Sequence, residues 1–190
     1  MQAFIHQMHP VSLGAISLLL IYFIAITWVF FYRYLLLHSW IKRESDSLQA
    51  LLTGEKSVSV FSYLYNFLRT NSVSAQLLSL SEISATKEST RMLAFVSLVA
   101  STSPFIGLFG TVVSLLDTFA RMAENSTGTM GVVTMGVSDA LVATAVGIFV
   151  ATFAYTFHQI LKRNAYELVE LIRMQSQALL TKKASSDAVG

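Results

Sequence analysis

One acidic side chain lies inside an otherwise uncharged apolar stretch of the sequence. Asp139 is the only Asp, Glu, Lys or Arg between Met130 and Gln159. A carboxyl group inside a membrane-spanning helix costs about 2.5–3.5 kcal/mol on insertion scales, so by default it marks an ion path or a partner. The alternative is a partly hydrated place at the outer mouth of a membrane protein, because Asp139 lies ten residues after Thr129, close to a short connection.

Small and hydroxyl side chains gather on one face of each of two apolar stretches. At 100° per residue, one helical face holds five of them: Gly107, Gly110, Thr111, Ser114 and Thr118. The corresponding face of the later stretch holds Ala140, Thr144, Gly147, Ala151 and Tyr155. Small residues let helix backbones approach closely, and hydroxyls form hydrogen bonds between helices. We therefore expect both faces to meet protein or water, with ordinary helix packing explaining most of the small residues. Asp139 lies about 140° around the helix from Thr144, so the two need not share a face.

Three further side chains near these faces have local roles. Pro104 removes one backbone hydrogen bond and bends its helix, and the Ser101 hydroxyl could satisfy the carbonyl that this frees. Asp117 and Arg121 are spaced i,i+4, which predicts an interfacial ion pair worth a few tenths of a kcal/mol. Together with Gly107, Gly110 and Gly147, Pro104 is expected to shape and pack the helices.

The composition excludes several function classes. The chain has no cysteine, which removes disulfides, thiolate catalysis and zinc–thiolate sites. A net charge of +2, with only 13% charged residues, does not suit a nucleic-acid module. The His6-x-x-His9 pair has no nearby carboxylate and is weak evidence for a metal. No phosphate loop, Ser-His-Asp arrangement or paired catalytic carboxylates are visible, so we expect no enzyme, no cofactor and no metal.

Three apolar stretches are long enough to cross a bilayer, which takes about 20 residues as a helix. Val11 to Tyr32 has 22 residues without a charge, Met92 to Leu116 has 25, and the third runs from Met130 to Gln159. The first does not look like a signal peptide, because no Lys or Arg precedes it and no small-residue cleavage site follows it.

The positive residues predict the orientation of these spans. None of the 13 Lys and Arg precedes the first span, seven lie between the first and second, one in the next connection, and five after the third. The positive-inside rule then places the N-terminus outside and the C-terminus inside. The predicted segments are a short outer N-terminus (1–10), spans at 11–32, 92–120 and 130–160, a cytoplasmic helical segment (33–91), a short periplasmic loop (121–129) and a cytoplasmic helical tail (161–190).

The fold class is predicted to be all-α. Between the first two spans, Trp40, Leu48 and Leu51 recur at near-helical spacing, with Gly54 as a plausible stop. The tail from Tyr166 to Leu180 continues a helical pattern, and alternation typical of strands is absent. We therefore expect a polytopic membrane protein with three transmembrane helices, of which the second and third are long and extend into the cytoplasm.

Two segments resemble a known family. SPFIGLFGTVVSLLDTF, residues 103–119, is similar to the second transmembrane helix of the TolQ/ExbB/MotA proton-channel family, and GVSDALVATAVGIFVAT, residues 136–152, is similar to its third. Order, separation and the three-helix layout also agree with the TolQ/ExbB branch. Val113 stands where the family has a tryptophan, Ser114 replaces the following glycine, and the third-helix proline is missing around Phe153.

The resemblance implies roles for single residues. Thr111 and Thr144 match family threonines that line a lumen beside the membrane aspartate of a partner subunit. Asp139 matches a family glutamate, whose side chain is one methylene longer than that of aspartate. Ser114 and Thr118, on the face of Thr111, are expected to line the same proton pathway.

The resemblance also implies partners and a location. It indicates a homopentamer in the bacterial inner membrane around a TolR/ExbD-like single-helix protein, which works with an envelope-spanning TolA- or TonB-like protein. The first helix would pack outside, facing lipid. The function implied is a proton-channel stator subunit that couples the proton-motive force to work on the cell envelope, in Tol-Pal or TonB-dependent transport.

Two other functions are compatible with three membrane helices. The first is a non-conducting scaffold that stabilises a membrane partner, which would tolerate Thr111 and Thr144 as Ala or Val. The second is a small transporter, whose usual mark is an inverted repeat, and three dissimilar helices do not show one.

Overall fold

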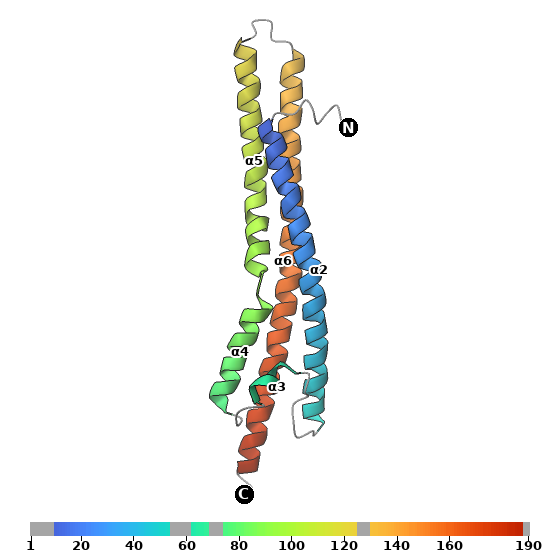
Figure 1. The fold of residues 1–190 in the computed structure, drawn as a ribbon, viewed down its shortest axis with the longest axis vertical. Helices are drawn as coiled ribbons and strands as arrows, with labels where there is room; N and C mark the ends of the chain where they lie inside the picture. Colours follow the sequence, from blue (N-terminus) through green and yellow to red (C-terminus); the bar gives the residue numbers. More distant parts are fainter. Residues whose placement is uncertain (1–9, 54–61, 69–73, 125–129, 188–190) are drawn as a thin grey trace. The chain divides into compact units, whose positions relative to one another are not determined.

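The computed structural model describes residues 10–53, 62–68, 74–124 and 130–187, and in these ranges the chain is helical without a strand (Figure 1). The helices are α2 (Pro10–Leu52), α3 (Tyr63–Leu68), α4 (Ala75–Ser89), α5 (Leu93–Glu124) and α6 (Met130–Asp187). The all-α prediction is confirmed. Gly54 and the His6-x-x-His9 pair lie outside the described residues.

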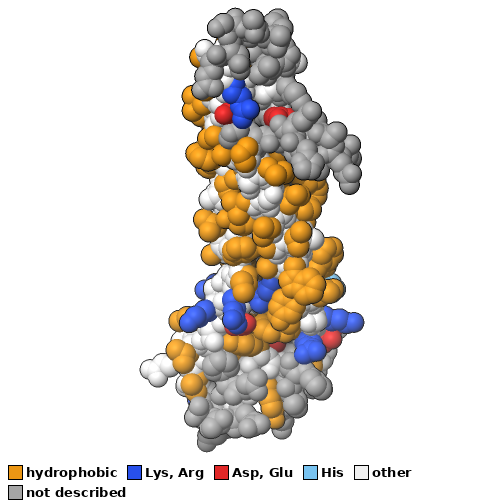
Figure 2. Space-filling model, turned by 45° about the horizontal axis from the view of Figure 1, so that its top comes forward, with side chains coloured by type: hydrophobic (Ala, Val, Ile, Leu, Met, Phe, Trp, Pro, Cys, Tyr) orange, Lys and Arg blue, Asp and Glu red, His pale blue; other side chains and the backbone are white. Residues whose placement is uncertain are grey.

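Three helical segments are long and apolar enough to cross a membrane, as predicted. They are Pro10–Leu52, Ala75–Ala123 and Gly136–Ser185. Large hydrophobic side chains stand exposed along them, such as Trp28 at 77% and Phe105 at 70%. Figure 2 shows hydrophobic side chains over much of the visible surface. In water such a surface would be unfavourable, whereas in hydrocarbon it is the expected one.

The chain divides into two compact units, to which α2 and α6 both contribute. The first unit contains the described residues among 1–29 and 94–158. Within it α5 and α6 are antiparallel: Gly107 lies against Gly147, and Thr111 against Ala140 and Thr144. An apolar core joins these helices to α2. It consists of Leu19, Ile26, Val99, Val150 and Ala154.

The second unit contains the described residues among 30–93 and 159–190. Its core side chains on α6 recur every three or four residues, which turns one stripe of the helix inward. They are Leu161, Ala165, Leu168, Ile172 and Leu179, and they pack with Leu37, Leu51, Leu64, Leu78, Ala85 and Leu93.

A buried polar network ties α2, α3 and α6 together in the second unit. The Glu44 carboxylate, 3% exposed, accepts hydrogen bonds from the Tyr63 backbone N–H at 2.6 Å and the Ser62 hydroxyl at 2.8 Å. The Gln175 amide donates to the same carboxylate at 2.8 Å and to the Glu44 carbonyl at 2.9 Å. A buried carboxylate is tolerated where hydrogen bonds replace its hydration.

The helical structure is interrupted between α4 and α5, and one arginine stabilises the backbone at this interruption. Met92 has a φ of 71°, a left-handed conformation that is uncommon outside glycine. The buried Arg33 guanidinium donates to the Glu88 carbonyl at 2.6 Å and the Ser89 carbonyl at 2.8 Å, which satisfies the end of α4. The helix containing the second predicted span therefore begins at Leu93, whereas the first and third spans belong to single helices of 43 and 58 residues.

Candidate functional site

Two threonine side chains meet between α5 and α6. The hydroxyls of Thr111 and Thr144 are hydrogen-bonded to each other. The Thr111 oxygen also lies 3.0 Å from the Ala140 carbonyl and 3.2 Å from the Gly107 carbonyl, and the Thr144 oxygen lies 3.4 Å from the Gly107 carbonyl. Both side chains are half-buried, so the pair joins the two helices and keeps part of its surface accessible to another molecule.

The donors and acceptors of this cluster are unequal in number. Each threonine hydroxyl carries one hydrogen and two acceptor lone pairs, and the two carbonyls only accept. When both hydroxyl hydrogens are donated to Gly107, Ala140 or the other threonine, no hydrogen remains to donate. Lone pairs on the threonine oxygens remain free to accept a hydrogen bond. Such a cluster accepts a hydrogen bond from a neutral carboxylic acid readily, and it must rearrange to donate to a carboxylate.

Two glycines bring the backbones of α5 and α6 into direct contact beside this pair. A Cβ on Gly107 would lie 2.8 Å from the Ala143 carbonyl oxygen, and one on Gly147 would lie 2.8 Å from the Ser103 carbonyl oxygen. On Gly110 it would lie 3.2 Å from the Ala143 Cβ. The structure thus places the three predicted packing glycines at close approaches, as small residues in membrane helices allow.

Ser114 and Thr118 are buried within the chain and hydrogen-bonded there. Ser114 is 3% exposed and hydrogen-bonded to the Ser12 hydroxyl of α2, and the buried Thr118 hydroxyl donates to the Ser114 carbonyl at 2.8 Å. Their hydroxyls therefore help to pack α5 within one chain, and their place along a proton pathway stays a prediction. Ser12 was missed by sequence reasoning, because a single serine in an apolar stretch carries no signal of its own.

Asp139 lies on α6 with little of its residue surface exposed. Its residue surface is 6% exposed. In the described ranges no hydrogen bond or ion pair reaches its carboxylate. No buried side-chain oxygen in the described residues lacks a hydrogen-bond partner, so the unpaired Asp139 carboxylate keeps oxygen surface that can meet water or another chain. Both interpretations of Asp139, an ion-path residue and a partly hydrated acid, remain predictions.

The remaining predicted side chains have local roles. Arg121 Nε lies 2.7 Å from Asp117 Oδ2, which is the expected i,i+4 ion pair at an exposed position. Pro104 stands inside an unbroken α5. The Ser101 hydroxyl does not satisfy the carbonyl that Pro104 frees, as we had suggested, because it donates to Leu98 at 3.0 Å and not to Ala100.

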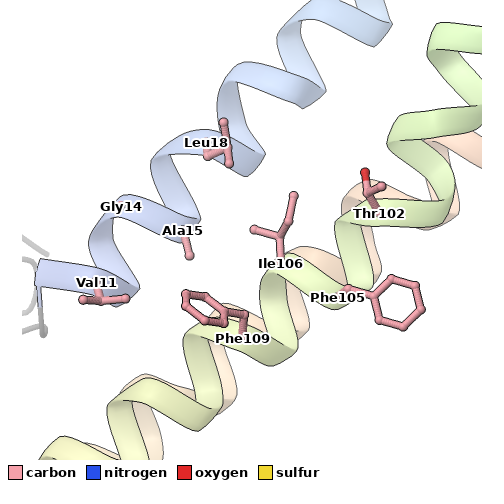
Figure 3. Close-up of a pocket in the computed structure, with 8 residues that line it drawn as sticks. All are labelled: Val11, Gly14, Ala15, Leu18, Thr102, Phe105, Ile106 and Phe109. Carbon is pink, nitrogen blue, oxygen red and sulfur yellow. The ribbon is translucent and has the colours of Figure 1, made fainter.

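An apolar groove of about 440 Å³ opens between α2 and α5 in the same unit (Figure 3). Its residues are Val11, Gly14, Ala15, Leu18, Thr102, Phe105, Ile106 and Phe109. The Thr102 hydroxyl, the one polar side-chain group among them, donates to the Leu98 carbonyl at 2.8 Å. The groove therefore offers hydrocarbon contact and no proton site.

A family model described as the MotA/TolQ/ExbB proton channel family matches residues 62–174, more than half of the chain. The chain belongs to the MotA/TolQ/ExbB proton channel family. The matched range contains the Thr111–Thr144 pair, the contact between Gly107 and Gly147, and Asp139, so these three features lie in the part of the chain that matches the family.

Curated relatives place the chain in the TolQ/ExbB branch of this family. The ExbB-like protein 1 of Helicobacter pylori is 38% identical over 166 residues, which cover 86% of this chain and 87% of that protein. TolQ of Pseudomonas aeruginosa is 44% identical over 59 residues, 31% of this chain and 26% of TolQ. ExbB of Salmonella typhimurium is 36% identical over 70 residues, 37% of this chain and 29% of ExbB.

Proposed function

We propose that this membrane protein is the proton-channel stator subunit of an inner-membrane motor. Several copies form a ring around a single-helix TolR- or ExbD-like partner, with the N-terminus in the periplasm and the C-terminus in the cytoplasm. The ring couples the proton-motive force to work on the cell envelope. Membership of the TolQ/ExbB branch supports this general role.

One observation carries the proposal: the hydroxyl pair of Thr111 and Thr144 stands between two membrane-spanning helices without a fixed charge among its contacts. A carboxyl group of a partner helix can enter such a place because hydroxyl and carbonyl oxygens replace part of its hydration. A lysine or arginine there would hold the carboxylate permanently charged, since an opposite charge lowers its proton affinity.

The hydrogen-bond balance of the pair suggests how protonation moves the partner. The free lone pairs accept a hydrogen bond from the neutral acid, so a protonated partner sits favourably beside Thr111 and Thr144. Loss of the proton leaves a carboxylate that must find donors elsewhere. One proton crossing the membrane releases about 2.3 kcal/mol per 100 mV, and a ring that binds the two protonation states at different places converts this energy into movement.

The test replaces each hydroxyl by a methyl group of similar size. We expect Thr111→Val and Thr144→Val to assemble normally and to lose proton flux. The matched control is Thr152→Val on α6, whose exposed hydroxyl bonds only its own helix at 2.9 Å. Proton uptake is measured in liposomes that hold the protein with its single-helix partner, and assembly is measured by native mass spectrometry.

The outcome separates a channel from the non-conducting scaffold. A scaffold needs the packing of α5 and α6, and it would keep its full envelope activity in all three variants. Equal proton flux in Thr144→Val and Thr152→Val would remove the threonine pair from the mechanism. Loss of assembly in Thr144→Val alone would instead make the pair a packing element.

A further inference from the structure

A charged groove of about 680 Å³ lies between α4 and α6 in the second unit. Thr86 of α4 and Thr90, which caps the end of that helix, border it on one side. The α6 side contributes Arg163, Ala165, Tyr166, Glu167, Val169, Glu170 and Arg173. In the described part of the chain none of its four charged side chains makes an ion pair or hydrogen bond, although two anions, Glu167 and Glu170, lie between two cations.

Apolar side chains also stand exposed on α4 and α6 in this unit. Tyr166 of the groove is 62% exposed, and on α4 Leu80 and Ile83 are 57% and 66% exposed. These residues lie in the segments 33–91 and 161–190, which the sequence assigns to the cytoplasm, where hydrocarbon would not cover them. Exposed aromatic and aliphatic side chains among unpaired charges are typical of a surface that binds protein.

The α2 part of the same unit offers a second set of unpaired charges. Lys42, Arg43 and Asp46 are exposed, and none of them has an ion pair within the described residues. In this unit α4 and α2 lie on opposite sides of α6 in the view of Figure 1. Two different surfaces on opposite sides are what a closed ring of identical subunits requires.

The contact between α2 and α6 fixes the relative heights of these two surfaces. Glu44 and Gln175 are hydrogen-bonded, so Lys42 lies near the level of Arg173, and Asp46 near that of Gln177. At 1.5 Å rise per residue, Glu170 is then about 4.5 Å from the level of Lys42, and Arg173 about 6 Å from that of Asp46. The two height differences have the same direction, and the side chains of Lys42 and Arg173 are long enough to span them.

We propose that the α2 surface of one copy (Lys42, Arg43 and Asp46) docks at the α4–α6 groove of the next copy. This inference rests on the ring of the proposed function, because rotation about the membrane normal leaves every height unchanged. Lys42 then pairs with Glu170 of the neighbouring copy, and Asp46 pairs with Arg173. Tyr166 is covered by the neighbouring α2.

The absence of cysteine allows a direct test by cross-linking in the full-length chain. The variant carries Lys42→Cys together with Glu170→Cys and is expressed in native membranes with the partner protein. We expect mild oxidation to give a ladder of covalent multimers up to the complete ring. Each single variant should give none, and neither should Lys42→Cys combined with Lys182→Cys, which lies 12 residues further along α6 than Glu170.

A charge-reversal series tests the same contact without cysteine. Glu170→Lys should weaken association several-fold, and Lys42→Glu added to it should restore association, because the pair is then reversed and not removed. A disulfide confined to one chain, or an intact ring without intermolecular cross-links, would overturn the proposed contact. Neither result touches the proton channel, which the threonine variants test separately through proton flux.

Discussion

The contact between Gly107 and Gly147 gives a quantitative prediction for Gly147→Ala. The new Cβ would lie 2.8 Å from the Ser103 carbonyl oxygen, 3.0 Å from the Gly107 Cα and 3.2 Å from the Gly107 nitrogen. All three are backbone atoms, which cannot rotate away as a side chain does. Ordinary contact at 3.4 Å requires α5 and α6 to separate by about 0.6 Å.

This separation has a cost and a functional effect. Overpacking of this kind costs about 1–3 kcal/mol, and the better helix propensity of alanine returns about 0.5–1 kcal/mol. We therefore expect a net loss of about 1–2 kcal/mol. The same movement weakens the contact between Thr111 and Thr144, so proton flux should fall together with stability.

The matched control is Gly14→Ala on α2, where a Cβ meets nothing within 4 Å. It should be neutral or slightly stabilising, because only the helix propensity changes. Unfolding of both variants in detergent micelles is followed by circular dichroism against a denaturant series. Equal stability of Gly147→Ala and Gly14→Ala would show that α5 and α6 do not touch through their backbones.

Three further variants follow from the hydrogen bonds and ion pairs described above. Arg33→Met should cost about 1–3 kcal/mol in thermal unfolding, because two carbonyls at the end of α4 lose their donors, whereas the exposed Arg91→Met should be neutral. Glu44→Gln should also cost about 1–3 kcal/mol, since an amide hydrogen then faces a donor from Gln175 or from the backbone; unchanged unfolding would refute the buried network. Asp117→Asn should change stability by less than about 0.5 kcal/mol, and a larger loss would mean that this exposed pair is not screened by water.

Much of the helical layout was predictable from the sequence. Apolar stretches of 22 and 25 residues without a charge have few structures available in a membrane other than a helix. The glycines on one face of the second stretch predicted a close neighbour. The identity of that neighbour needed the structure, because helical periodicity gives a face and not the register that sets Thr111 against Thr144.

Other features had no signal in the sequence. The sequence predicts a span at 11–32 and helical spacing around Trp40, but it does not show that a single helix, α2, runs through both from Pro10 to Leu52. Charged residues such as Lys42 interrupt the apolar pattern without interrupting the helix, since lysine is a good helix former. The break before Leu93 carries no glycine or proline, and its left-handed residue is a methionine.

Backbone contact through Gly107 and Gly147 limits which parts of the protein can change conformation. Neither helix can come nearer to the other, and moving apart sacrifices dispersion contacts along the whole hairpin. We therefore expect α5 and α6 to move together as one rigid unit. In the ring that we propose, deformation is then left to the contacts between neighbouring subunits and to the enclosed partner helix, so inhibitors of the motion are better sought at those contacts than between α5 and α6.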